Sequence, residues 1–503
     1  MGKTTQVMHQ LLHNGILIPE YKPSEEALQI LCKERSYGLH PSEEEMAVAW
    51  ARKLDTPYVQ DPIFKQNFFH DFIETLKWTN VSPEDFNFSE IKEVLDREKQ
   101  AKLNWSPEQK KADRLQRKAF EQNKLRYGYA IVDGVKTEIA NYRAEPAGIF
   151  MGRGAHPKRG SWKAAVSAEE VSLNLSPDAP MPAGFVNRVW EPSKCYVAKW
   201  RDKFSGKIKY IFFADSSVIR QSGDIEKYDK AVALLKNFDK VSTLIEKNLT
   251  AKDKQRRQIA TCCWLIENLG LRVGDESNPD EAETIGSTTL KKEHLSFSKD
   301  GRILTLDFLG KDSVHYQNSI NVTAQVETNL KEFCTNPDGK LFGDITSTDV
   351  NNFLSEAMPS LTAKVFRTAL GTSLLQSFLN KHTPKDISGI AEYVKVLTAK
   401  YANLEAAKFL NHRRALPKNF EQSLKKKEEK LHHLLAEKKY EAADKLKAEI
   451  DFQAKAGNYS LNTSLRSYLD PRIFMTWCKT VELDPKKVYS KTLLSKFSWS
   501  VEK

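Results

Sequence analysis

The amino-acid sequence predicts an α+β protein in which a mixed amino-terminal half precedes a mainly helical half. Up to about residue 217, strand-like alternation and helical periodicity take turns, whereas long helical patterns dominate from Ser217 onward. A charge-dense stretch from Lys418 to Gly457 carries only a narrow apolar seam. With 503 residues, 40% of them hydrophobic, the chain is long enough to bury several cores.

The first predicted unit is a small helical subdomain from Pro41 to Trp78. Ser42 and Glu45 have the spacing of a capping box. Four phenylalanines give the second part of this segment its apolar face: Phe64, Phe68, Phe69 and Phe72. A charged helix is then predicted to open at Ser106-Pro107 and to run to about Arg126.

Strands are predicted next. Residues 129–132 and 135–139 form a hairpin pattern around the turn Asp133-Gly134, and residues 195–200 and 207–213 form another. Between the two hairpins lies the glycine-rich, basic stretch GIFMGRGAHPKRG. Its glycines would let backbone amides and basic side chains approach phosphates, although a solvated basic loop explains the pattern as well.

The second half is predicted to be helical around a small sheet. Helices are expected over residues 228–249 and 253–271 and from Ser347 and Thr362, with three short strands between residues 295 and 316. A break at 437–440 makes the charge-dense stretch a helical hairpin. Two Asp-Pro pairs, at 470–471 and 484–485, signal further helix starts.

These patterns divide the chain into four expected domains. They are a cap lobe over residues 1–217, a core over 218–418, a helical linker over 419–457 and a carboxy-terminal domain over 458–503. For the linker, a solvated connector without ligand contacts is an equal alternative.

Charge and composition favour a polyanionic partner. Lys plus Arg number 77 against 66 for Asp plus Glu, a formal charge of +11. Nucleic acid is favoured over a membrane, because no apolar run approaches the roughly 20 residues of a spanning helix. The first residues lack a secretory signal, so an intracellular protein is expected.

Several common sites are not indicated. The early GKTT lacks the glycine-rich loop of a nucleotide-binding P-loop, since only Met1 precedes Gly2. The six cysteines include no C-x-x-C pair, so neither a zinc site nor a disulfide framework is predicted.

Tyr468 is the leading candidate nucleophile. It lies in LNTSLRSYLDPRIFMTWCK, directly before a helix that Asp470 can cap and Pro471 can open. On this stretch alone, a packed tyrosine with a hydrogen-bonded hydroxyl is the alternative.

Candidate partners for this tyrosine occur upstream in LRVGDE, LDFLGKDS, LTAKVFR and FLNHRRALP. With TSLRSYLDPR, these segments resemble in order and spacing the active-site segments of eukaryotic-type DNA topoisomerase IB. HNGILIPEY, NYRAEPAGIFMGRGAHPK and GKIKYI extend the resemblance to nearly the whole chain. The family's catalytic residues then fall on Arg272, Lys311, Arg367, His412 and Tyr468.

The resemblance implies a catalytic lobe of the tyrosine recombinase and topoisomerase IB type and a 3′-phosphotyrosyl intermediate. The arginines would meet the extra charge of the transition state, His412 would donate a hydrogen bond, and Lys311 would protonate the leaving 5′ oxygen. The implied reaction relaxes positive and negative supercoils without ATP, cofactor or required metal.

The same resemblance assigns DNA contacts. They fall on Arg153, Lys209, Tyr210, Asp312, Lys364 and Ser467. Met151 and Ser467 depart from the arginine and asparagine that relatives usually carry there. Since that asparagine helps to bind camptothecin-type poisons in the family, we expect reduced sensitivity. Cleavage complexes trapped by camptothecin as efficiently as in an asparagine-bearing relative would contradict this expectation.

The implied partner is double-stranded DNA, held by a monomer clamped round the duplex, with no membrane. We expect a chromosome-associated protein in a nucleoid or the cytoplasm, or in the nucleus if the source is eukaryotic. A tyrosine recombinase and a non-catalytic DNA clamp are the alternatives, to be distinguished by strand transfer between duplexes and by the absence of a covalent adduct.

Overall fold

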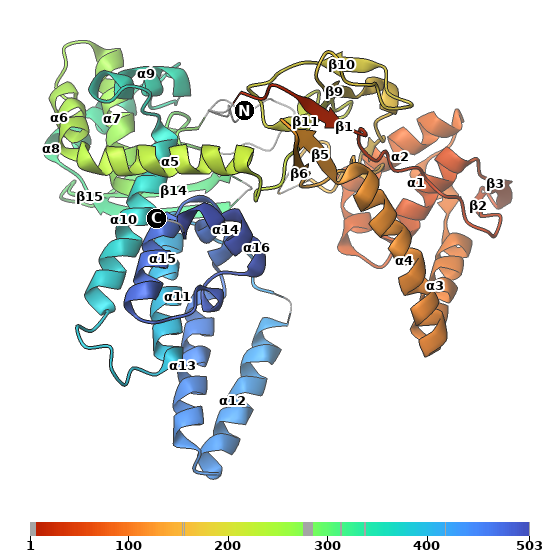
Figure 1. The fold of residues 1–503 in the computed structure, drawn as a ribbon. Helices are drawn as coiled ribbons and strands as arrows, with labels where there is room; N and C mark the ends of the chain where they lie inside the picture. The colour runs from red at the N-terminus through yellow and green to blue at the C-terminus, as the bar shows by residue number, and fades with distance from the viewer. Residues whose placement is uncertain are drawn as a thin grey trace. The chain divides into compact units, whose positions relative to one another are not determined.

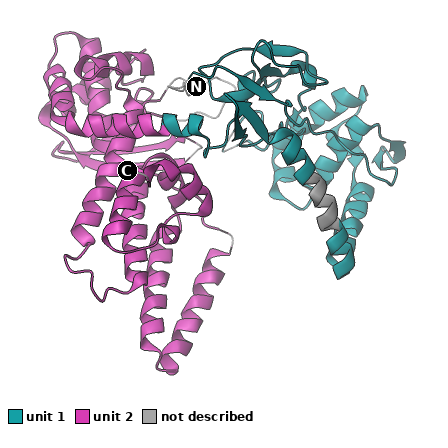
Figure 2. Cartoon of the chain, in the orientation of Figure 1, with its two compact units in different colours: residues 1–223, 279–282 teal, residues 224–278, 283–503 magenta. Residues whose placement is uncertain are grey.

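The computed structural model describes residues 7–152, 154, 156–274, 285–311, 314–336, 339–417 and 419–501. These residues form two compact units, which divide between Gly223 and Asp224 (Figure 2). Figure 1 shows that strands concentrate in the first unit and helices in the second. The predicted α+β fold class is confirmed.

The first unit begins with a helical subdomain. Its elements are α1 (Pro41–Ala51), α2 (Pro62–Leu76), α3 (Ser89–Leu103), α4 (Pro107–Tyr127), β2 (Gln29–Cys32), β3 (Arg35–Gly38) and β4 (Phe86–Asn87). The predicted phenylalanine face of α2 is buried, and the Phe68 ring stacks 4.4 Å from Trp50 of α1. Aromatic packing of this kind supplies large apolar burial from few residues.

The capping box predicted at Ser42 and Glu45 was wrong, because the cap of α1 lies two residues earlier. The residue that caps α1 is His40, whose backbone N–H donates to Glu43 at 2.8 Å. Pro41 explains the difference, because proline has no N–H to satisfy and its fixed φ suits the first helical position.

The rest of the first unit is strand-rich. A three-stranded antiparallel sheet has the order β1-β5-β6, a four-stranded mixed sheet has the order β10-β9-β11-β12, and β7 pairs with β8. Their bounds are β1 (Leu11–His13), β5 (Tyr129–Val132), β6 (Val135–Glu138), β7 (Gly148–Ile149), β8 (Trp162–Lys163), β9 (Ser172–Asn174), β10 (Asn187–Val189), β11 (Tyr196–Arg201) and β12 (Ile208–Phe212). Both predicted hairpins are present, and Asp133 and Gly134 have the positive φ of a tight hairpin turn.

The second unit packs helices around a three-stranded antiparallel sheet. The sheet has the order β13-β14-β15. The elements are α5 (Val218–Lys236, shared with the first unit), α6 (Phe238–Asn248), α7 (Lys254–Leu269), β13 (Leu295–Phe297), β14 (Ile303–Gly310), β15 (Val314–Asn321), α8 (Ala324–Phe333), α9 (Ser347–Ala357), α10 (Ala363–His382) and α11 (Glu392–Phe409). The single helix predicted over residues 228–249 is wrong, because the chain breaks at Asn237 and starts α6 anew.

The carboxy-terminal part of the second unit packs against α10 and forms a hydrophobic core with it. The hairpin of α12 (Phe420–Ala436) and α13 (Tyr440–Ala456) is present as predicted, and the two helices lie side by side (Figure 1). It is followed by α14 (Leu461–Ser467), α15 (Pro471–Thr480) and α16 (Lys491–Lys496). Phe474 and Phe497 are fully buried in one cluster with Leu375 of α10. The chain after the hairpin is therefore fixed against the helices that precede it.

The second Asp-Pro signal produces only a short turn. Asp484 accepts a hydrogen bond from the N–H of Lys486, but the turn is a 3₁₀ helix over Pro485–Lys487. Burial of Tyr489 immediately afterwards directs the chain into the core.

Among the described residues, no helix combines the length and the apolar character that crossing a membrane requires.

Candidate active site

Tyr468 lies between α14 and α15, where the backbone is tied down on both sides. Its N–H donates to the carbonyl of Ser464 at 2.9 Å. The hydroxyl of Thr372 on α10 donates to the carbonyl of Tyr468 and accepts from the N–H of Asp470, both at 3.2 Å. Asp470 is buried and caps α15 as predicted. The tyrosine is therefore positioned by α10 as well as by its own helix.

Arg367 lies on α10 against the ring of this tyrosine. Its guanidinium donates to the carbonyl of Gly270, and to that of Leu410 at 2.8 Å. Its central carbon is 5.2 Å from the centre of the Tyr468 ring. Burial and the nearby charge of Arg272 lower the pKa of Arg367 to about 10, so the group remains a cation at neutral pH.

The electrostatics around Tyr468 favour its phenolate. Burial by itself raises the pKa of a phenol, because it disfavours the charged form. Here the charges of Arg367 and Arg272, with hydrogen bonds from both guanidinium groups, outweigh burial and lower the pKa below its ordinary value. The tyrosine thus has the property that a nucleophile needs.

His412 follows α11 and is almost completely buried. Its ring lies 4.9 Å from the Tyr468 ring, and its Nδ1 is 2.8 Å from the hydroxyl of Ser464. Burial, together with the charges of Arg367 and Arg272, lowers the pKa of His412 to about 3. The imidazole is therefore neutral at physiological pH and can offer only one N–H.

A cavity of about 120 Å³ brings the other predicted residues together. Arg272, Lys311, Arg367 and His412 all line it, together with Phe308 and Tyr316 of the sheet. Lys311 is exposed at the turn between β14 and β15, as the sequence predicted. Since Arg367 and His412 also contact the Tyr468 ring, the structure places all five predicted catalytic residues in one neighbourhood.

The predicted DNA-contacting residues are distributed over both units. Lys364, in the first turn of α10, and Ser467, at the end of α14, are exposed in the second unit. Lys209 and Tyr210 lie on β12 of the first unit. There Lys209 approaches Asp202 and Glu145 at 3.7 and 3.8 Å, and the Tyr210 ring packs 5.1 Å from that of Tyr196. Arg153 and Asp312 lie outside the described residues.

The sequence did not predict the residues that hold the site side chains in position. Thr372 and Ser464 contact partners 96 and 52 positions away, so no local pattern could identify their contacts. The sequence did offer one signal, which is helical spacing, because Ser464 lies one turn before Tyr468, the residue that directly follows α14.

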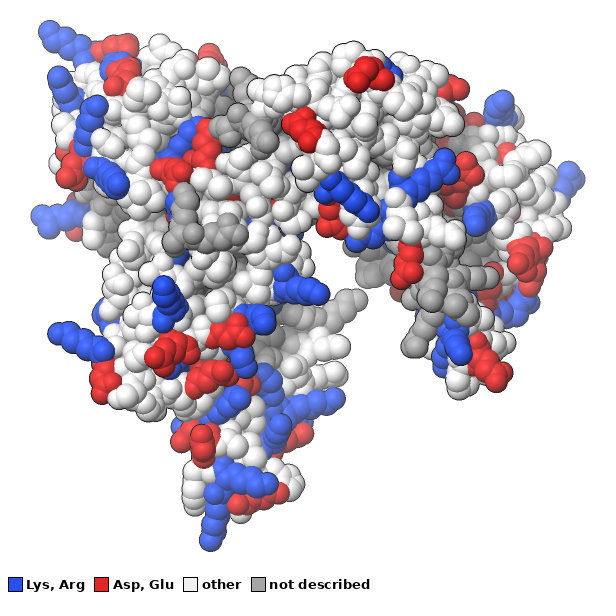
Figure 3. All heavy atoms as spheres, viewed as in Figure 1, with Lys and Arg blue, Asp and Glu red and all other residues white. Residues whose placement is uncertain are grey.

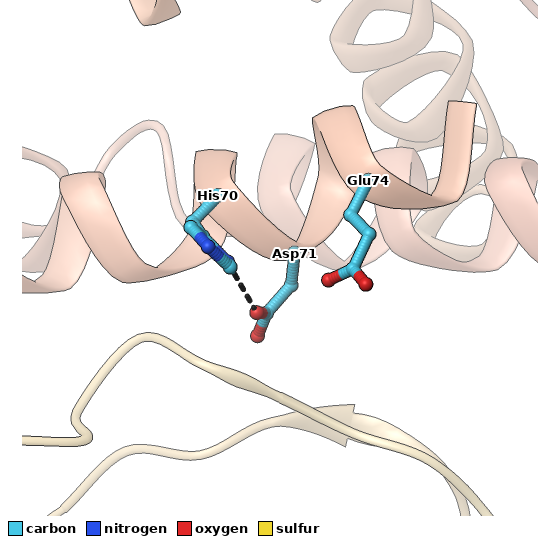
Figure 4. A group of neighbouring side chains, drawn as sticks. All are labelled: His70, Asp71 and Glu74. Atoms are coloured by element: carbon cyan, nitrogen blue, oxygen red, sulfur yellow. Dashed lines mark hydrogen bonds and ion pairs between the residues drawn. The ribbon is translucent and has the colours of Figure 1, made fainter. Parts of the chain in front are cut away.

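One possible metal-binding group was also missed. His70, Asp71 and Glu74 of α2 lie with their ligand atoms within 4.8 Å of one another (Figure 4). Protein donors already occupy Asp71, which accepts from the backbone N–H of Trp162 at 2.6 Å and contacts His70 at 3.2 Å. The group belongs to the first unit, whereas Tyr468 belongs to the second.

Charge is concentrated on the linker hairpin. On the face drawn in Figure 3, Lys and Arg side chains crowd α12 and α13, with Asp and Glu among them. Lys427 of α12 and Glu449 of α13 approach to 4.0 Å across the hairpin. Mixed charge of this kind suits a solvated surface that can also approach a polyanion.

Comparison with known protein families matches three consecutive models. Residues 7–213 match the DNA-binding fragment of eukaryotic DNA topoisomerase I, residues 216–446 its catalytic core, and residues 440–503 the C-terminal topoisomerase domain. The described site residues of the second unit therefore lie within the last two matches.

Similar proteins carry the same description over nearly the whole chain. DNA topoisomerase 1 alpha of Arabidopsis thaliana is 34% identical over 98% of this chain, which spans 58% of that relative's length. DNA topoisomerase 1 of Homo sapiens is 32% identical over 98% of this chain and 70% of its own length, and that of Candidozyma auris is 32% identical over 86% and 59%. The agreement of these relatives with the three family matches shows that the chain belongs to the eukaryotic DNA topoisomerase I family.

Proposed function

We propose that this chain is a type IB DNA topoisomerase that relaxes positive and negative supercoils by transient cleavage of one strand. Tyr468 gives its phenol proton to water and its oxygen attacks the scissile phosphorus, so that a P–O bond to that oxygen forms and the bond from phosphorus to the 5′ oxygen breaks. The products are a 3′-phosphotyrosyl bond and a free 5′ hydroxyl. The covalent bond conserves the energy for resealing, so the proposed cycle needs neither ATP nor a metal.

Each side chain of the site has a distinct task in this proposal. Arg272 and Arg367 pair with the non-bridging oxygens, where negative charge grows in the transition state. His412 donates one further hydrogen bond to the phosphate. Lys311 gives its proton to the departing 5′ oxygen and takes it back during resealing.

The observation that carries the proposal is the paired arginine environment of Tyr468. Two guanidinium groups lower the pKa of a half-buried phenol, beside a cavity that they line with Lys311 and His412. A structural tyrosine hydroxyl would need one ordinary hydrogen bond. A second buried cation beside that hydroxyl lowers the stability of the folded protein. Such a cation is useful where the site must bind an anionic phosphate.

DNA binding is proposed to involve both units, divided as the sequence suggests. Residues 1–217 would act as a cap and 218–418 with 458–503 as the catalytic part, closing as a monomer round a duplex, with 419–457 as the linker. The match of residues 7–213 to a DNA-binding fragment supports this division. Contacts from Lys209, Tyr210, Lys364 and Ser467 would position phosphates.

The test is relaxation of negatively and positively supercoiled plasmid in EDTA without ATP. The wild type should relax both, and Tyr468→Phe should lose activity while still binding DNA. Tyr440→Phe is the matched control, because this tyrosine is 62% exposed on the linker and should be dispensable.

Three outcomes would count against the proposal. Activity surviving in Tyr468→Phe would mean that another group is the nucleophile. Strand transfer between two duplexes would favour a tyrosine recombinase. Salt-sensitive DNA binding by the wild type, without relaxation or a covalent adduct, would favour a non-catalytic clamp.

A further inference from the structure

The hydrogen bonds of His412 leave one ring nitrogen available to a ligand. Nδ1 is 2.8 Å from the Ser464 hydroxyl, whereas Nε2 is buried and has no hydrogen-bond partner among the described residues. Arg367 and Arg272, which line the same cavity as His412, are both cations. Nε2 is therefore the nitrogen through which His412 can contact an anion bound there.

A neutral imidazole carries one N–H, so its proton can lie on either nitrogen. With the proton on Nδ1, the ring donates to Ser464 and presents a lone pair on Nε2 to the anion. With the proton on Nε2, the ring accepts from Ser464 and presents a donor. Only the second arrangement can stabilise a phosphate.

The burial of Ser464 decides between these arrangements. The residue is fully buried on α14, and His412 is the only hydrogen-bond partner of its hydroxyl within the described part of the chain. If Nδ1 were the donor, the serine hydroxyl proton would be buried without an acceptor, which is costly. If the hydroxyl donates to Nδ1, the one proton left without a protein acceptor is the N–H on Nε2, and His412 lines the cavity in which a bound anion can accept it.

We propose that Ser464 is a positioning residue for the reaction, because its hydroxyl donates to Nδ1 of His412 and thereby keeps the imidazole N–H on Nε2, toward the scissile phosphate. This inference rests on the proposed function for its consequence, but the tautomer itself does not depend on DNA. The carbonyl of Ser464 also accepts from the N–H of Tyr468. Ser464 thus contacts both Tyr468, through its carbonyl, and His412, through its hydroxyl.

The direct test is ¹⁵N NMR of the full chain with labelled histidine, in which protonated and unprotonated ring nitrogens resonate far apart. The chain has 11 histidines, so loss of one signal in His412→Gln assigns the resonance. The wild type should show His412 with its proton on Nε2. Ser464→Ala should give a mixture of tautomers, and Ser464→Thr, which keeps a hydroxyl, should restore the wild-type form.

The kinetic test is single-turnover cleavage of a duplex by the same proteins at saturating concentration. A mixture of tautomers leaves the donor on Nε2 in only part of the molecules, so the rate in Ser464→Ala should be about 2-fold to 10-fold lower, with rescue in Ser464→Thr. Ser355→Ala, which removes a serine hydroxyl bonded within the α9 region, should leave both tautomer and rate unchanged.

A wild-type His412 with its proton on Nδ1 would overturn the inference, and this result needs no variant to fold. Unchanged tautomer and rate in folded Ser464→Ala would overturn it as well. Failure of the wild type to cleave DNA would instead refute the proposed function, while the NMR result would still decide which group donates in the Ser464–His412 pair.

Discussion

At the scale of single residues, the site around Tyr468 is a region of unfavourable charge that an anion can relieve. Arg272 and Arg367 repel each other, and this repulsion is one reason why the pKa of Arg367 falls to about 10. The hydrogen bonds that fix Arg367 are made by two backbone carbonyls and not by a carboxylate. Such a site stays fixed before its anion arrives, which is the arrangement that electrostatic catalysis requires.

If Lys311 is the general acid, its importance should depend on the leaving group. Lys311→Ala should slow single-turnover cleavage of ordinary DNA by about 10²-fold to 10⁴-fold, because the 5′ oxygen then departs without a proton. A substrate with a bridging 5′ sulfur should largely remove that deficit, since a thiolate leaves without protonation. The measurement is the ratio of rates on the two substrates.

His412→Gln provides the comparison for this prediction. This variant should slow cleavage of the oxygen and sulfur substrates by a similar factor, because the hydrogen bond proposed for His412 goes to a non-bridging oxygen. Equal deficits of Lys311→Ala on both substrates would contradict the role of Lys311 as the acid.

Acid should destabilise the first unit through His13. Its Nε2 donates to the carbonyl of Asn174, and its Nδ1 accepts from the N–H of Gly15, both at 3.1 Å, so the buried ring has no place for a second proton. Burial lowers its pKa to about 4, against the 6.5 that is ordinary for a histidine side chain. Between these values the unfolded chain binds a proton that the folded chain excludes, so stability is lost as pH falls from about 6.5 to about 4.

The size of this effect is measurable by urea unfolding at several pH values. The shift corresponds to about 3 kcal/mol at full effect. His13→Gln should be less stable at pH 7 but should lose less stability between pH 6.5 and 4.

At the scale of elements, the site is built where helices end. Gly270 ends α7 with a left-handed φ of +58°, and its carbonyl holds Arg367. Leu410, just after α11, supplies the other carbonyl. Free carbonyls at helix ends need partners, and here a guanidinium uses two of them, so the ends of two helices fix the side chain of Arg367.

Substitution of Gly270 should therefore damage the site as well as the fold. An added Cβ would lie 2.6 Å from the Phe409 ring, next to Leu410. Gly270→Ala should lower the free energy of unfolding by about 2–4 kcal/mol, combining left-handed strain with overpacking, and should slow cleavage. Urea unfolding and single-turnover cleavage measure the two effects.

Gly389→Ala separates the two causes. Gly389 also has a left-handed φ, of +76°, but an added Cβ would meet nothing within 4 Å. This variant should lose only about 1–2 kcal/mol and keep its cleavage rate. If both alanine variants behave alike, contact with Phe409 does not matter to the site.

Local signals account for much of what the sequence predicted at this scale. Ser106-Pro107, Asp253 and Asp470 each cap a helix where expected, and Asp133-Gly134 turns the predicted hairpin. The errors arose where tertiary packing or a neighbouring residue changed a boundary, as at Asn237 and Asp484.

The grouping of the site residues depended on a different source of information. The family resemblance predicted that five residues belong to one site: Arg272, Lys311, Arg367, His412 and Tyr468. The groups that hold these side chains in place could not be predicted from the sequence. Thr372 and the Gly270 carbonyl act through contacts that form only in the folded chain. Arg367 and Gly270, for example, are 97 positions apart.

At the scale of the whole molecule, the net charge of +11 should govern how the two units bind DNA. Each phosphate contacted by a cation releases condensed counterions, so the logarithm of the binding constant should fall linearly with the logarithm of salt concentration, with a slope of about −0.9 per contact. The proposed contacts read phosphates, so the slope should be the same on unrelated sequences.

Lys364→Ala should make the slope shallower by about one contact and weaken binding equally on every sequence. Lys240→Ala is the matched control, because it also removes one exposed cation, here from α6. It should leave the slope unchanged. Fluorescence anisotropy over a range of salt concentrations measures both. Equal slopes for the two variants would mean that binding senses the total charge rather than phosphate contacts at α10, and a sequence-dependent loss in Lys364→Ala would mean that this lysine reads bases.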